Sequence, residues 1–150
     1  MKLEDQVCTV TQAFTLKALG VIQKSIFYHH RASERPLFGE TVVTEFGKQY
    51  KKVQVCNDKK GAASAFTVAE LSQMLPNYYP SWRFPEQENG PLRWIATVIC
   101  GPKPPGIDDI HTAHEFDRYG ATQAEALATL LIALLETNVI TPAEVNERLK

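Results

Sequence analysis

The chain has 150 residues, of which 44% are hydrophobic and 22% charged, and its formal net charge is −1. This length suits one domain, and the composition is typical of a globular protein with a sizeable core. A nearly neutral chain has no overall attraction to polyanions. These values therefore exclude proteins that bind nucleic acid or acidic membranes through their total charge.

Charge is nevertheless unevenly distributed along the chain. Residues 17–60 contain nine Lys/Arg and four Asp/Glu, whereas residues 61–150 contain six Lys/Arg and eleven Asp/Glu. A basic face in the first half could attract phosphates. Charges spread over solvated surfaces explain the same counts, and we prefer that interpretation.

The cysteines and the apolar segments indicate a soluble, cytoplasmic protein. Cys8, Cys56 and Cys100 form no C-x-x-C motif, and residues 1–16 contain no apolar core typical of a signal peptide. We therefore expect reduced thiols. Residues 126–135 form the longest uncharged run near the C-terminus, and this run is shorter than the roughly 20 residues of a membrane-spanning helix. We expect no membrane partner.

Four Thr-x-x-(Gln/Glu) motifs predict where helices begin. In such a capping box the Thr hydroxyl accepts a hydrogen bond from the third helical N–H, and the Gln or Glu side chain accepts one from the N–H of the Thr. We expect helices over residues 10–19, 68–75 and 123–137, and a last helix that begins at Pro142. Residues 123–137 carry a periodic apolar stripe that should face the core. The motifs are Thr9–Gln12, Thr67–Glu70, Thr122–Glu125 and Thr141–Glu144.

Runs of β-branched and aromatic residues predict the strands. We expect strands over residues 21–30, 92–100 and about 110–119, and a hairpin that joins residues 38–46 to residues 49–56. Residues 92–100 are apolar in both alternating sets, which is typical of a central strand. Residues 77–91 contain three prolines and a glycine and are expected to form a loop. The fold class is therefore α+β, with residues 1–150 as a single domain: an antiparallel sheet of about five strands with three to four helices packed on it.

Residues 108–117 have the composition of a metal site, with two histidines and four carboxylates. On a helix, His111, His114 and Glu115 would share a face. On a strand, His111 and His114 point to opposite faces, and Glu115 lies about 13 Å from His111. Because the sequence favours a strand here, we expect no metal and no other cofactor, and these three residues remain weak candidates as metal ligands.

No other segment carries a recognisable catalytic motif. His29 and His30 are expected at an exposed strand end. Cys8 precedes a helix N-terminus, which favours a thiolate, but its apolar neighbours favour a structural role. The chain has no G-x-S-x-G, P-loop or G-x-G-x-x-G motif, so we expect no catalytic residues.

Two segments are candidates for binding. The first is an aromatic segment whose residue types are enriched at protein-binding hot spots: Tyr78, Tyr79, Trp82, Arg83 and Phe84. The second is a run of lysines that could contact phosphates, although lysines on edge strands also prevent aggregation: Lys48, Lys51, Lys52, Lys59 and Lys60.

Three segments resemble a family of small, uncharacterised proteins from phage and mobile elements of Bacteroidetes-type bacteria. The first runs from Val7-Cys8-Thr9 to Gly20 and is similar to C-T-x-x-Q-A-x-x-L-K-x-L-G. The second, from Phe66 to Pro76, is similar to T-V-A-E-L-x-x-M-L-P. The third, from Ala121 to Glu136, is similar to a closing A-x-A-x-x-x-L-I-x-L-x-E helix. The resemblance implies a small cytosolic accessory protein with no assigned activity.

These observations favour a non-enzymatic domain that binds a protein, in a phage or mobile-element setting. The partner could be a second copy, through apolar faces on the two C-terminal helices. An alternative is a nucleic-acid-binding accessory that uses the Lys48–Lys60 hairpin. A third hypothesis is an undetected metal-dependent enzyme.

Overall fold

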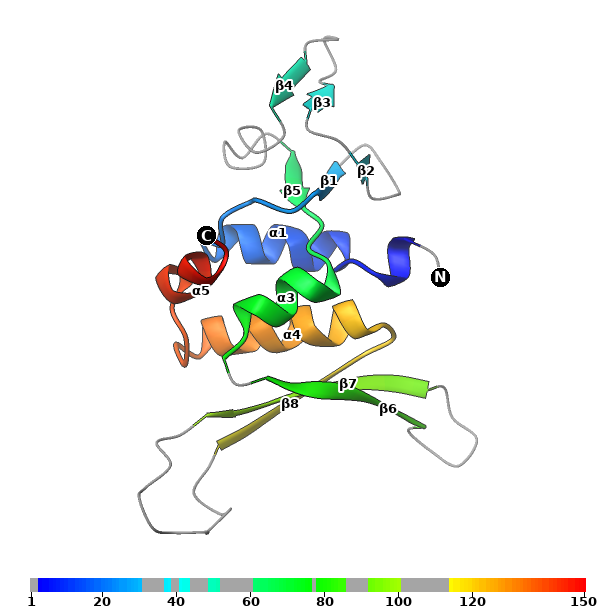
Figure 1. The fold of residues 1–150 in the computed structure, drawn as a ribbon, viewed down its shortest axis with the longest axis vertical. Coiled ribbons are helices and arrows are strands. Elements are labelled where there is room, and N and C mark those ends of the chain that lie inside the picture. The colour runs from blue at the N-terminus through cyan, green and yellow to red at the C-terminus, as the bar shows by residue number, and fades with distance from the viewer. Residues whose placement is uncertain are drawn as a thin grey trace.

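The computed structural model describes residues 3–30, 37–38, 41–43, 49–51, 61–76, 78–85, 92–100 and 114–150. In this part of the chain, helices form a middle layer with a small antiparallel sheet on either side (Figure 1). The fold is α+β, as the sequence predicts. The helical segments are η1 (Leu3–Asp5), α1 (Val10–Ala18), α3 (Val68–Met74), α4 (Gln123–Glu136) and α5 (Pro142–Arg148).

The described strands form three sheets rather than one, so the single sheet of about five strands is not confirmed. Their orders are β2-β1-β5, β3-β4 and β6-β7-β8, and all the pairs are antiparallel. The strands are β1 (Phe27–His30), β2 (Leu37–Phe38), β3 (Thr41–Val43), β4 (Gln49–Lys51), β5 (Ala62–Ser64), β6 (Tyr78–Pro85), β7 (Leu92–Cys100) and β8 (His114–Gly120).

All four predicted helix starts are confirmed. The Thr hydroxyl accepts the expected hydrogen bond in each, and the reciprocal bond is present at Thr9, Thr67 and Thr141. At α4 the Glu125 side chain instead accepts from the N–H of Ala121, at 2.8 Å. Hydrogen bonds from Thr141 hold the pKa of Glu144 below its usual range, because they favour the charged carboxylate.

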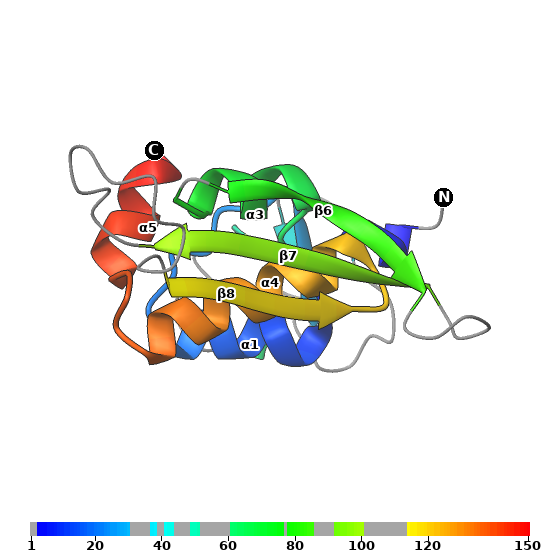
Figure 2. The same cartoon turned by 90° about the horizontal axis from the view of Figure 1, so that it is seen from below.

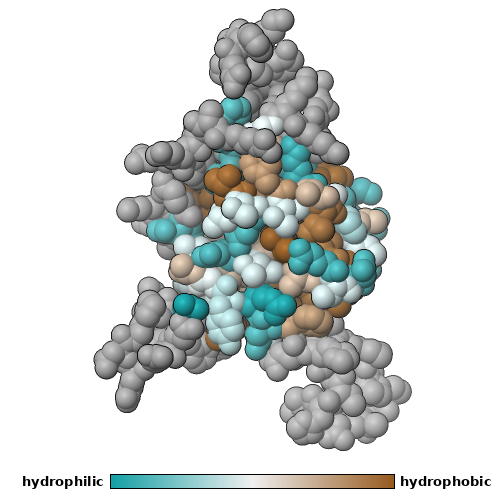
Figure 3. Space-filling model, turned by 180° about the vertical axis from the view of Figure 1, so that it is seen from behind, coloured by the Kyte–Doolittle hydropathy of each residue, from teal (hydrophilic) through white to brown (hydrophobic). Residues whose placement is uncertain are grey.

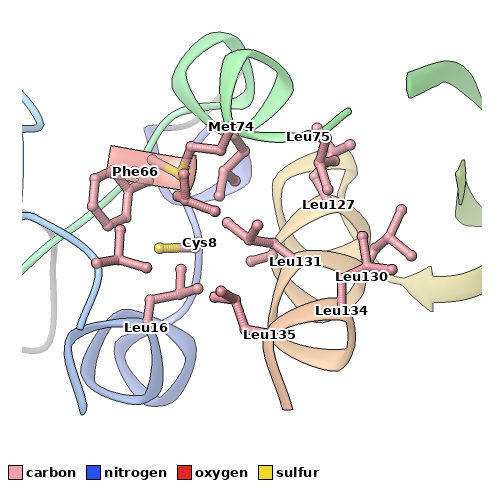
Figure 4. Packing of buried hydrophobic residues seen from close by; sticks show 14 of the residues in the cluster. Cys8, Leu16, Phe66, Met74, Leu75, Leu127, Leu130, Leu131, Leu134 and Leu135 are labelled. Atoms are coloured by element: carbon pink, nitrogen blue, oxygen red, sulfur yellow. The ribbon is translucent and has the colours of Figure 1, made fainter. Parts of the chain in front are cut away.

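The core lies between α4 and the elements on both sides of it. The predicted apolar stripe of α4 is buried, together with three more alanines on the same helix. Figure 4 shows Cys8 among side chains from α1, α3 and α4, next to Phe66 and Met74. The exposed apolar face that we expected on α4 is therefore wrong, because that face is the core; self-association stays a prediction. On the molecular face shown in Figure 3, apolar and polar residues are interspersed.

Two predicted elements differ from the structure. Only Phe27–His30 of the strand expected over residues 21–30 is a strand, because side chains bond the segment before it. The Gln23 side chain accepts from the Ser64 N–H at 2.6 Å, and the Ser25 hydroxyl lies 2.9 Å from the Ala65 carbonyl. Strand β5 itself was not predicted. Its residues are small and fully buried, and they let α1 pack closely.

The segment expected as a loop, Tyr78–Pro85, is strand β6. Its aromatic residues favour extended structure, and that preference outweighs the prolines. Pro80 lies between Tyr79 and Trp82, where the register with β7 shifts, which is a position that tolerates a residue without an N–H.

None of the described helices is long and apolar enough to cross a membrane.

Gln12 joins the first helix to the fourth. Its Oε1 accepts from the Thr9 N–H at 3.0 Å and completes the cap of α1. Its Nε2 donates to the Glu125 carbonyl at 2.9 Å and to the Thr129 hydroxyl at 2.8 Å, both on α4. One amide side chain thus caps a helix and holds it against the core helix.

We expect Gln12→Glu to lower the free energy of unfolding by about 1–3 kcal/mol, because the carboxylate keeps the cap but places an acceptor against the Glu125 carbonyl. Chemical denaturation of the purified protein measures this change. Glu144→Gln, the reverse exchange in the exposed cap of α5, is the control and should have a smaller effect. Equal effects would mean that the contact between α1 and α4 adds no stability.

Gly120 ends β8 and leads directly into α4. A Cβ atom at this position would lie 2.9 Å from the Glu125 carbonyl carbon and would also collide with the Ala126 nitrogen. We expect Gly120→Ala to destabilise the fold by about 1–3 kcal/mol or more, since backbone would have to move. Gly20→Ala is the comparison. Gly20 has φ +89°, but an added Cβ would make only an ordinary van der Waals contact there, with Pro142 Cβ at 3.5 Å. Thermal unfolding should show a larger loss for Gly120→Ala, and the reverse order would contradict this packing.

Candidate functional site

The β6-β7-β8 sheet has one face against the helices. Ala96 and Val98 of β7 are fully buried, and Trp94 and Phe116 pack against the same core. Helix α4 contacts both β7 and β8 on this side. We call this side of the β6-β7-β8 sheet the inner face.

The opposite side, here called the outer face, carries the alternate residues of the same strands. No described helix or strand lies over it, as Figure 2 shows from below. Arg93 is exposed and the Tyr119 side chain is 54% exposed, while Ile95 and Thr97 are half-buried. The Thr97 hydroxyl donates to the Asp117 carboxylate at 2.6 Å, which joins β7 to β8 across this face.

The register of β6 places three predicted binding residues on the outer face. Tyr79 pairs with Thr97, Trp82 with Ile95, and Phe84 with Arg93. Cross-strand partners share a face of the sheet. Three aromatic positions of β6 therefore belong to the same face as Ile95, Thr97 and Tyr119.

The other two predicted residues fall on the inner face. Tyr78 pairs with Val98, and Arg83 with Trp94. The five candidates therefore do not form one surface. These residues are divided between two faces because side chains alternate along a strand. We expected a loop here, so the sequence alone could not predict this division.

The two middle rows of the outer face contain aromatic and apolar positions together with Thr97 and Asp117. One row across the sheet is Trp82, Ile95 and Tyr119, and the next is Tyr79, Thr97 and Asp117. Arg93 lies at one end of β7. Towards the other end, Glu115 pairs with Ile99.

Strand β8 is an edge strand of the described β6-β7-β8 sheet, and a charged side chain bonds to its backbone. The Arg118 guanidinium donates from Nη1 to the Asp117 carbonyl at 2.7 Å. A charged side chain bonded to edge backbone disfavours pairing with a strand of another chain. The edge is therefore a poorer docking site than the outer face.

The metal and lysine candidates lie only partly within the described residues. His114 and Glu115 are consecutive in β8 and so lie on opposite faces, and His111 lies outside the described part. No group of three potential metal ligands occurs among the described residues. Of the lysines, Lys51 is in β4, opposite Thr41; Lys48, Lys52, Lys59 and Lys60 lie outside the described ranges.

Cys8 and His29 meet in the interior, but their geometry does not suit catalysis. The Cys8 thiol is fully buried, and burial raises its pKa to about 12, so it stays protonated. The contact with His29 is made by the Cys8 carbonyl, not by its sulfur, at 2.8 Å from Nε2. Cys8 is therefore a buried core residue, in agreement with its apolar neighbours in the sequence.

The exposed position that we expected for His29 is wrong, since this side chain is only 3% exposed. Because a carbonyl only accepts, Nε2 carries the proton of the neutral ring. Nδ1 is buried and has no hydrogen-bond partner among the described residues. Burial lowers the pKa of His29, although the bond to the Cys8 carbonyl opposes this effect.

No family model, curated protein or solved structure matches the chain.

The buried His29 predicts a pH-dependent stability. Its folded pKa is below the unfolded value of about 6.5, so the unfolded chain binds more protons in mild acid. The contribution of His29 to stability should be constant well above that value and should decrease as the pH falls through the folded pKa. Denaturation of wild type and His29→Gln between about pH 5 and pH 8 should show a flatter profile for the variant. Identical slopes would contradict a buried, neutral His29.

Proposed function

We propose that this protein is a non-enzymatic interaction domain and that its outer face binds a protein partner. The observation that carries the proposal is the register of β6, which adds three aromatic positions to an uncovered face that includes the exposed Tyr119. Aromatic residues are enriched at the centres of protein interfaces, where truncation of a side chain costs the most binding energy.

The charges on the outer face favour a protein over a nucleic acid. The face has one arginine, Arg93, and two acidic positions, Asp117 and Glu115. Proteins that bind single-stranded nucleic acid combine stacking aromatics with a basic groove, so that both contact one strand. Here the aromatic positions share their face with the Asp117 carboxylate, which would repel phosphates. Lys51, the described member of the lysine run, lies in a different sheet.

The setting that we propose is that of the family the chain resembles, a small accessory protein of a phage or mobile element. The support for this setting is the resemblance of three segments, which begin at Val7, Phe66 and Ala121.

The chain contains two tryptophans, and the register assigns them to opposite faces of one sheet. They provide a matched pair. We expect Trp82→Ala to abolish partner binding and leave the unfolding temperature nearly unchanged. Trp94→Ala should lower the unfolding temperature clearly, because loss of a large core side chain costs about 3–5 kcal/mol at a fully buried site and less at this partly buried one.

Binding is measured by cross-linking in an extract of the source cells, with a photoreactive amino acid in place of Tyr119. The same amino acid at Glu147, whose side chain is 78% exposed on α5, is the control. A protein adduct at position 119 that is absent at position 147 and is lost with Trp82→Ala supports the proposal. Unfolding of Trp82→Ala would assign Trp82 to the core, and the absence of any adduct at position 119 would contradict the proposed surface.

A further inference from the structure

We propose that His29 makes the attachment of strands β1 and β5 to the helices sensitive to protons, so that mild acid opens this pair of strands while the packing around α4 remains. Strands β1 and β5 lie on the opposite side of the helices from the outer face (Figure 1). This opening therefore does not depend on the proposed function.

The buried His29 ring is bonded at only one of its two nitrogens. Nε2 lies 2.8 Å from the Cys8 carbonyl, whereas Nδ1 has no hydrogen-bond partner among the described residues. The neutral ring tolerates this arrangement, because Nδ1 then carries a lone pair instead of a proton. Protonation would add a charge and a second N–H to an interior where the described residues offer that N–H no acceptor, which is costly.

The titratable groups on the neighbouring elements do not compensate such a charge. The Cys8 thiol stays protonated. On α1, Lys17 is itself a cation, and it donates from Nζ to a β5 carbonyl at 2.6 Å. On α3, the Glu70 carboxylate accepts from the N–H of Thr67 at 2.7 Å. The pKa of His29 is lowered by burial against the opposing effect of the Cys8 carbonyl, so no described carboxylate stabilises the charged ring.

The contacts of β1 and β5 make a local opening feasible. Strand β1 packs on β5, β5 packs on α1, and α4 contacts α1 from the other side (Figure 1). Lifting the two strands therefore leaves α4 in contact with α3, β7 and β8. Ala63, the cross-strand partner of His29, shares its face of the sheet and buries less apolar area than a larger side chain would.

An opening that brings His29 into water takes up one proton in mild acid. The folded pKa of this ring lies below the unfolded value of about 6.5, so the open form binds the proton more strongly. The equilibrium constant for opening should therefore rise by up to about tenfold for each pH unit below about 6.5, until the folded pKa is reached.

Amide hydrogen exchange of the full chain, followed by NMR spectroscopy at about pH 5 and about pH 7 and corrected for intrinsic exchange rates, tests the inference. The amides of Ser64 and Ala65 are bonded to the segment around β1 and report on the local opening. The amides of Leu130 and Leu131 in α4 report on global unfolding. We expect Ser64 and Ala65 to be less protected than α4 and to lose protection in acid. Low concentrations of urea should accelerate their exchange less than that of α4, because a local opening exposes less surface.

Two adjacent histidines provide a variant and its matched control. His29→Gln keeps a donor for the Cys8 carbonyl but does not titrate, so the loss of protection in acid should disappear at Ser64 and Ala65. His30→Gln changes the next residue of β1, which belongs to the opposite face of the strand, and should keep the wild-type pH dependence.

Three results would overturn the inference. Equal protection and equal urea dependence of the β5 and α4 amides in the wild type would mean that the strands open only with the whole fold. A local opening whose equilibrium constant is the same at both pH values would mean that it takes up no proton. Both outcomes are measured on the wild type and need no variant to fold. The third is a pH dependence that His29→Gln retains, which would assign the proton to another group.

Discussion

The burial of α4 is the constraint on which the rest of the structure depends. This helix contributes nine buried residues, more than any other element, and it contacts α1, α3 and the β6-β7-β8 sheet. A helix that is apolar on most of its surface must be covered on several sides. The β6-β7-β8 sheet and the helices α1 and α3 supply this cover, and the polar contacts of Gln12 fix α1 in place against α4.

That constraint also determines which face of the β6-β7-β8 sheet remains available. Because α4 covers Ala96 and Val98, strand alternation turns Ile95, Thr97 and their cross-strand partners away from the helices. The exposed Tyr119 and the outer-face positions of β6 follow from the same alternation. The outer face therefore contains only some residues of the aromatic segment, and it combines them with residues from β7 and β8.

The parts of the fold that local chemistry determines could be predicted from the sequence. The four Thr residues at the helix starts, the apolar stripe of α4 and the central position of β7 all depend on residues that are close in sequence. The unpredicted parts depend on partners that are distant. Ala62–Ser64 is a strand because β1 pairs with it, and Gln23 is buried because the Ser64 N–H donates to it. The aromatic residues of the candidate site could be identified from the sequence. Their division between two faces could not, because it depends on the register of β6 with β7.

The side-chain bonds of Gln12 and Asn146 also have a consequence for how the chain folds. Gln12 binds residues 113 and 117 positions away, and Asn146 binds Ile22 and Gly20 at separations of 124 and 126. Contacts between such distant residues must wait for loop closure, which slows folding. During synthesis, α1 leaves the ribosome long before α4 exists, so the side of the first helix that packs on α4 has no native partner until the final part of the chain emerges. The nascent chain is consequently a candidate for chaperone binding over most of its translation.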